Sequence, residues 1–139
     1  GPRQVGFYGM VVPRFVDAAI KNEPITVYGD GTQTRCFAHV SDVIDALLKV
    51  AGTDKTIGTV VNIGNNFEIS ILDLAKKIIE ITGSKSEITF VDYADAYEAG
   101  FEDMQRRVPS TQRLVSLTGW KVTKSLEEMI RDVAADLAK

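Results

Sequence analysis

Residues 11–31 read VVPRFVDAAIKNEPITVYGDG, and this stretch decides the fold class. From 11 to 21 the apolar residues recur every three or four positions, which is the period of an amphipathic helix. Pro24 ends this pattern, and the β-branched and aromatic run 25–28 is typical of a short strand. The two glycines that flank Asp30 form a strong turn signal. A helix that leads directly into a strand predicts an α/β domain.

Four further helices are predicted from capping residues followed by an apolar period. They follow Ser41 or Asp42, Ser70, Ser110 and Ser125. Ser70 and Ser125 each have an acidic residue three positions later, as in a capping box, and glycines 83 and 119 supply helix ends. The apolar stripes are Ile44, Leu47, Leu48 and Ala51 in the first of these helices, Leu114 and Leu117 in the third, and Leu126, Ile130, Val133 and Leu137 in the last. We expect the last two stripes to face inward.

Three other segments are predicted to be extended. Residues 59–63, Thr-Val-Val-Asn-Ile, form the clearest strand because they are rich in β-branched residues and end at a glycine. Residues 35–40 and 87–91 are also extended, whereas 92–100 has no clear period and is predicted to be a loop. The sum is one α/β domain over residues 1–139, with about five helices and four short strands.

Composition and charge exclude several classes of protein. Hydrophobic residues make up 45% and charged residues 25% of the 139, with a net charge of −3 and no strongly basic run. These values predict a folded domain with no nucleic-acid partner. No apolar stretch approaches the ~20 residues of a membrane span, and no signal peptide is recognised, so a cytoplasmic domain is the default expectation.

Cofactor and metal chemistry have little support in the sequence. The chain contains no Gly-x-Gly-x-x-Gly cradle and no Gly-x-x-x-x-Gly-Lys loop, so we expect it to bind no cofactor by itself. Its single histidine, His39, lies in an apolar run and is predicted to be structural or to mark a helix entry. The single cysteine, Cys36, is predicted to be a small buried hydrophobic residue, and one His with one Cys makes no zinc site.

Arginines and one tyrosine are the informative polar features. Arg35 follows the glycine turn, and Arg106–Arg107 precede a rigid Val-Pro unit. Two guanidinium groups from distant segments can hold a diphosphate by bidentate contacts, although surface ion pairs are the commoner role of such arginines. Tyr28 ends a strand beside a glycine and can stack on a nucleobase or be an ordinary half-buried strand aromatic. The segment 93–101 is either a lid over a site or a solvated loop.

The order of these motifs resembles the C-terminal half of the NAD-dependent epimerase/dehydratase family, the extended short-chain dehydrogenases that act on nucleotide sugars. UDP-glucuronate decarboxylases and UDP-glucose 4-epimerases are the relatives that it resembles most. The motifs that carry the resemblance are Gly1–Gln4, Gly9–Val16, Pro24–Gly31, Gln33–Phe37, His39–Val43, Val61–Gly64, Arg106–Pro109, Gly119–Trp120 and Ser125–Glu128. They span almost the whole chain in the order and spacing of the family.

This resemblance implies a substrate-binding role for the chain. In the family this half holds the nucleoside diphosphate of a UDP- or dTDP-sugar, while the N-terminal half holds NAD. Arg35 and Arg107 match the two arginines that contact the diphosphate from opposite sides, and Tyr28 matches the residue beside the base. The remaining matched positions are Val27 on the base-side strand and Val12, Pro13 and Phe15 in the helix that borders the nucleotide.

The departures from the family concern its catalytic part. The glycine-rich cofactor loop and the Tyr-x-x-x-Lys pair belong to the upstream half and are absent here, so no catalytic residue is predicted in this chain and the chain alone is expected to be inactive. We therefore expect a small substrate-binding domain without a complete Rossmann domain. The alternative is a truncated remnant that binds no nucleotide and self-associates, or binds a partner, through the apolar face that the missing half leaves uncovered.

Overall fold

The computed structural model of the chain describes residues 1–4, 10–92 and 104–139. Its elements are, in order, α1 (Val11–Lys21), β1 (Ile25–Tyr28), β2 (Thr34–Cys36), α2 (Val40–Ala51), the short 3-10 helix η2 (Asp54–Thr56), β3 (Glu68–Ser70), α3 (Ile71–Thr82), β4 (Ile88–Val91), α5 (Gln112–Thr118) and α6 (Leu126–Leu137). Within these residues the prediction of an α/β domain with five α-helices and four short strands is confirmed. The predicted loop and possible lid at 93–101 lie outside the described residues.

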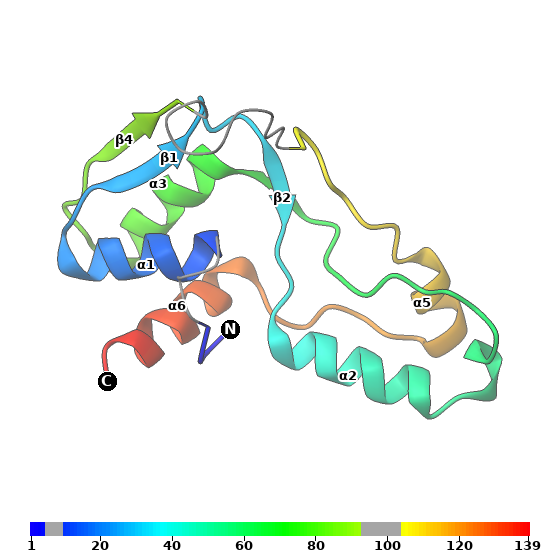
Figure 1. Ribbon diagram of the computed structural model, residues 1–139. Coiled ribbons are helices and arrows are strands. Elements are labelled where there is room, and N and C mark those ends of the chain that lie inside the picture. The colour runs from blue at the N-terminus through cyan, green and yellow to red at the C-terminus, as the bar shows by residue number, and fades with distance from the viewer. Residues whose placement is uncertain (5–9, 93–103) are drawn as a thin grey trace.

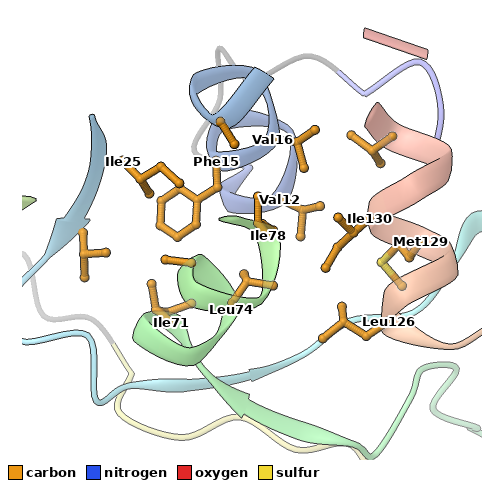
Figure 2. Close-up of a cluster of buried hydrophobic side chains, with 14 residues drawn as sticks. Val12, Phe15, Val16, Ile25, Ile71, Leu74, Ile78, Leu126, Met129 and Ile130 are labelled. Atoms are coloured by element: carbon orange, nitrogen blue, oxygen red, sulfur yellow. The ribbon is translucent and has the colours of Figure 1, made fainter. Parts of the chain in front are cut away.

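The larger of two lobes contains the main hydrophobic core (Figure 1). In it, α1, α3 and α6 pack on one another, and α1 and α3 also contact β1, which pairs in parallel with β4 so that Ile25 is in register with Ile88. Figure 2 shows the ring of Phe15 between α1 and α3, beside Ile25. This core holds the N-terminal end of α1 in place, and that end borders the candidate site.

Helix ends in this lobe follow the predicted capping chemistry. Ser70 Oγ accepts a hydrogen bond from the amide of Asp73, and Ser125 and Glu128 form a complete capping box at the start of α6. Gly83 ends α3 with a φ of +65°, a left-handed conformation that glycine adopts without strain. The stripe of α6 faces the core as predicted except at its end, where Leu137 is exposed.

The smaller lobe contains α2 and α5 and a second core of Ala46, Leu114 and Trp120. Ser110 does not cap α5 as predicted, because that helix begins one residue later with Thr111 at its N-cap position and no side-chain cap. His39 rather than Ser41 or Asp42 caps α2, since its Nδ1 accepts a hydrogen bond from the amide of Ser41 at 3.2 Å. The helix-entry role of His39 is therefore confirmed.

One strand prediction is wrong, and one apolar helix stripe is exposed, in the smaller lobe. Residues 59–63 form no strand, and the fourth strand is instead β3, which pairs antiparallel with β2. The apolar stripe of α2 is exposed at Ile44, Leu47 and Leu48. A strand forms only where another strand accepts its backbone hydrogen bonds, and the described residues offer none to 59–63. Val60 is accordingly 79% exposed.

The described residues can also be compared with the requirements of a membrane span and of a metal site. None of the helices in the described ranges is long and apolar enough to cross a membrane. Among the same residues there is no group of three or more His, Cys, Asp or Glu side chains that could hold a metal ion.

Candidate functional site

Two arginines that lie far apart in the sequence are brought together by strand register. Thr34 and Arg106 form a parallel β-bridge, and the amide of Thr34 donates to the carbonyl oxygen of Gln105 at 2.8 Å. The next residues along the two segments, Arg35 and Arg107, are therefore neighbours across adjacent extended chains, which run ~4.8 Å apart. Both residues line one pocket.

We call this pocket the arginine pocket and define it by Arg35, Arg107, Val12, Pro13 and Met129, with Cys36 at its edge. Its volume is about 290 Å³, and a second pocket of about 430 Å³ shares Cys36, Ala38 and Arg107 with it. Small-molecule sites in proteins occupy roughly 300–1,000 Å³. The arginine pocket combines an apolar wall from α1 and α6 with two permanent positive charges.

Arg35 is held in position by backbone oxygens. Its Nη1 donates to the carbonyl of Thr34 at 2.7 Å and to the carbonyl of Met104 at 2.6 Å. These bonds tie β2 to the segment that carries Arg107, and they leave the guanidinium partly exposed at the pocket. Arg107 is exposed. An arginine fixed in this way loses little conformational freedom when it binds an anion.

Arg106, the neighbour of Arg107, is engaged elsewhere. Its Nε and Nη2 both donate to the carboxylate of Glu68, with Nε–Oε1 and Nη2–Oε2 distances of 2.9 Å. Hydrogen bonds from Arg106 and then from Thr34 hold the pKa of Glu68 below its ordinary value. Arg106 therefore forms an ion pair with Glu68, whereas Arg107 lines the arginine pocket.

The predicted base-binding residue Tyr28 lies outside the arginine pocket. The guanidinium of Arg14 stands 4.7 Å from the centre of the Tyr28 ring and donates to its hydroxyl at 3.2 Å. Arg14 also donates to the carbonyl of Thr26, so it fixes the outer side of β1. Tyr28 lines a separate hollow together with Arg14 and Pro24.

The other predicted site residues divide into two groups. Val12 and Pro13 are buried side chains that line the arginine pocket. Phe15 and Val27 are 1% and 0% exposed and belong to the main core. The structure thus brings Arg35, Arg107, Val12 and Pro13 together, whereas Phe15 and Val27 support the site through packing.

Several site residues were not predicted from the sequence. Met129 comes from α6 and Glu68 from β3, both distant in sequence, and no local pattern marks either residue. Cys36 is partly exposed at the junction of the two pockets rather than buried. Partial burial and then the nearby Glu68 carboxylate raise the pKa of its thiol, which disfavours the reactive thiolate.

A family model described as GDP-mannose 4,6 dehydratase matches residues 1–133. The chain belongs to the NAD-dependent epimerase/dehydratase family. The family inferred from the ordered motifs is thereby confirmed. The sequence of this epimerase/dehydratase chain contains no Gly-x-Gly-x-x-Gly cradle.

The relatives of this epimerase/dehydratase chain have the names of enzymes that act on nucleotide sugars. The UDP-N-acetyl-alpha-D-glucosaminuronate decarboxylase of Bacillus cytotoxicus is 38% identical over 133 residues, which are 95% of this chain and 41% of the relative. UDP-glucuronic acid decarboxylase 1 of Xenopus tropicalis is 39% identical over 128 residues, which are 92% of this chain and 28% of the relative.

A solved structure with the same fold is the UDP-glucuronic acid 4-epimerase of Bacillus cereus in complex with UDP-glucuronic acid and NAD. The match has a TM-score of 0.86 at 27% identity and covers 99% of this chain and 42% of the epimerase. The epimerase/dehydratase chain thus spans less than half the length of each of these three relatives.

Proposed function

We propose that this chain is the substrate-binding part of an NAD-dependent epimerase, dehydratase or decarboxylase, and that it binds the nucleoside diphosphate of a UDP- or dTDP-sugar. The observation that carries the proposal is that Arg35 and Arg107, which follow the bridged residues Thr34 and Arg106, line one pocket. The names of the relatives support the ligand class, since those proteins act on or bind UDP-sugars.

The chemistry of the pocket suits a diphosphate. Guanidinium groups stay charged at any physiological pH and match two phosphate oxygens with two parallel donors. The hydrogen bonds from Arg35 Nη1 to the carbonyl oxygens of Thr34 and Met104 hold this guanidinium at the pocket. The apolar wall of Val12, Pro13 and Met129 lowers the local dielectric constant and so strengthens these contacts.

We propose that Tyr28 contributes to the base-binding end of the site. Its ring contacts the Arg14 guanidinium, and an aromatic ring of this kind is a surface on which a nucleobase can stack. The contribution of Tyr28 is separable from that of the arginines because the two lie in different hollows. Phe15 and Val27 would act indirectly by fixing α1 and β1.

The chemical step is assigned to the rest of the enzyme. NAD would accept a hydride from the sugar and return it, and the Tyr-x-x-x-Lys pair of the family is not found in these 139 residues. The residues described here would hold and orient the substrate. We accordingly expect binding without turnover from this chain alone.

We further propose that the exposed apolar face of α2 packs on the cofactor-binding part of the enzyme. This face consists of Val40, Ile44, Leu47 and Leu48, which recur at helical spacing and are all exposed. The strand-like residues 59–63 follow it in the chain and contain the exposed Val60. The relatives carry more than half of their length outside the matched region, which supplies an occupant of the right kind. Without that occupant the same face would favour self-association.

A titration with UDP, dTDP and AMP tests the binding function. Calorimetry should give saturable binding of UDP or dTDP up to millimolar concentration, and weaker binding of AMP. Arg35→Ala and Arg107→Ala should each weaken UDP binding by ~1.5–3 kcal/mol, the scale of a hydrogen bond to a charged group. Tyr28→Leu should weaken UDP binding by ~1–3 kcal/mol through lost stacking.

The matched control is Arg131→Ala, which removes an exposed arginine from α6 and should leave the affinity unchanged. Equal affinities in the Arg35, Arg107 and Arg131 variants would overturn the diphosphate site. A folded native chain that ignores all three nucleotides while it self-associates would favour the alternative of a module without a nucleotide ligand.

A further inference from the structure

The Arg106–Arg107 dipeptide poses a problem of register. The two side chains are chemically identical, and successive side chains of an extended segment point to opposite sides. A shift of one residue along β2 would place Arg106 beside Arg35 and turn Arg107 away. Some other contact must therefore decide which arginine reaches the pocket.

Glu68 makes contacts that distinguish the two arginines. Its carboxylate accepts two hydrogen bonds from Arg106 at 2.9 Å, and Oε1 also accepts one from the Thr34 hydroxyl. Thr34 is the register partner of Arg106 and pairs through β2 with β3, the strand that carries Glu68. One carboxylate thus bonds to the side chains of both residues of the bridge.

The position of Glu68 is itself fixed by the sheet. It is in register with Cys36 in the antiparallel pair of β2 and β3, and the following residues 69 and 70 continue this pairing. Its side chain is less exposed than that of Arg106. A bidentate pair anchored on a strand is the kind of ion pair that holds a defined geometry, unlike a single contact between two mobile side chains.

We propose that Glu68 is a positioning residue that binds Arg106 and thereby selects Arg107 for the arginine pocket. The inference rests on the proposed binding of a nucleoside diphosphate and names the residue that sets its geometry. Glu68 touches no ligand in this arrangement. It acts through register, and it neutralises a third arginine that would otherwise compete for the anion.

The decisive experiment is a double-mutant cycle on UDP binding with Glu68→Gln and Arg107→Ala. In the native chain Arg107→Ala should weaken UDP binding roughly 10- to 150-fold. Glu68→Gln alone should weaken it several-fold. When Glu68→Gln is already present, the fold-loss of UDP affinity caused by Arg107→Ala should be less than a third of the fold-loss in the native chain. The reason is that Arg106, released from Glu68, can then replace Arg107.

Controls separate this role from general stability. Glu127→Gln removes a comparable exposed ion pair with Lys77 and should leave both the affinity and the Arg107→Ala factor unchanged. The exchanged pair Glu68→Arg with Arg106→Glu should recover most of the affinity lost in Glu68→Gln. An Arg107→Ala factor that is the same with and without Glu68 would overturn the proposal while leaving the nucleotide site intact.

A measurement without ligand keeps the inference testable if UDP does not bind. Hydrogen exchange of the Thr34 amide, which donates to Gln105 in the native register, should be at least several-fold faster in Glu68→Gln than in Glu127→Gln. Equal exchange rates would mean that Glu68 does not hold the register. If the Arg35→Ala and Arg107→Ala variants both bind UDP as tightly as the native chain, the proposed function itself would be refuted.

Discussion

Asp42 connects the two lobes, and its replacement by asparagine should destabilise the chain strongly. Its side chain lies in the first turn of α2, and the residue is only 2% exposed. Oδ2 accepts from the amides of Thr123 and Lys124 at 3.2 and 3.0 Å, and Oδ1 accepts from the Thr123 hydroxyl. The segment that leads into α6 is thereby fastened to the start of α2.

The size of the expected loss of unfolding free energy follows from the hydrogen-bond acceptor that Asp42→Asn removes. An asparagine side chain at this position would keep one oxygen but present an NH2 group to a backbone N–H donor. Hydrogen bonds to a charged group contribute ~1.5–3 kcal/mol each, and a buried unsatisfied donor costs ~1–3 kcal/mol. We expect Asp42→Asn to lower the free energy of unfolding by about 2–4 kcal/mol at pH 7. Asp45→Asn, on the same helix but exposed, should cost less than ~1 kcal/mol.

The pH dependence supplies a second test with a defined sign. Burial alone would raise the pKa of Asp42, but the hydrogen bonds from Thr123 and Lys124 outweigh it and hold the pKa below its ordinary value of 3.8. A carboxyl group with a lowered folded pKa stabilises the fold fully above the unfolded pKa, and this contribution is lost as the pH falls through the folded pKa. The difference in the free energy of unfolding between the native chain and Asp42→Asn should therefore be constant from pH 7 to about 5. It should become smaller below pH 3.8.

Urea unfolding followed by tryptophan fluorescence is the assay. Trp120 is the single tryptophan, is buried in the second core, and donates from its indole nitrogen to the backbone carbonyl of Asp42 at 3.1 Å. It therefore reports on the lobe that the substitution loosens. The reasoning would be refuted if Asp42→Asn lost no more unfolding free energy than Asp45→Asn. It would also be refuted if the difference in unfolding free energy between the native chain and Asp42→Asn stayed the same below pH 3.

Two other substitutions test the core and the exposed face. Phe15→Ala should lower the free energy of unfolding by ~3–5 kcal/mol, whereas Phe15→Leu, which refills part of the cavity, should cost less and leave UDP affinity unchanged; an altered affinity in the folded leucine variant would indicate direct contact with the ligand. Leu48→Glu should reduce concentration-dependent self-association in sedimentation velocity without lowering the unfolding free energy by more than ~0.5 kcal/mol, because Leu48 is 68% exposed. Association that persists in this variant would argue against the α2 face as the contact.

Local chemistry explains the parts of the fold that could be predicted. The bounds of α1 and β1 agree with the sequence prediction because Pro24 and the glycine turn act within a few residues of the elements they limit. The same holds for Ser70 and Ser125, whose hydroxyls bind amides three residues away. Such contacts depend on the backbone conformation alone and need no tertiary partner.

The site was less predictable because its contacts join distant segments. Arg106 and Glu68 are 38 residues apart, and no period or spacing relates them. Arg14 and Tyr28 lie on different elements, so the stacking that occupies one side of the ring was not visible in either pattern. The sequence itself marks Arg35 and the Arg106–Arg107 dipeptide, the resemblance to the family selects Arg107, and only the bridge between Thr34 and Arg106 brings the two segments together.

The failed strand prediction and the exposed apolar stripe of α2 lie close together in the chain. Residues 40–51 have the period of a helix that covers an apolar surface, and 59–63 have the composition of a buried strand. A helix followed within a few residues by such a strand is half of the βαβ unit that builds parallel sheets. Residues 59–63 form no strand because no strand pairs with them within the described residues, and the apolar stripe of α2 is exposed at Ile44, Leu47 and Leu48. The Leu48→Glu variant is therefore a direct test of whether this exposed apolar face of α2 is a contact surface.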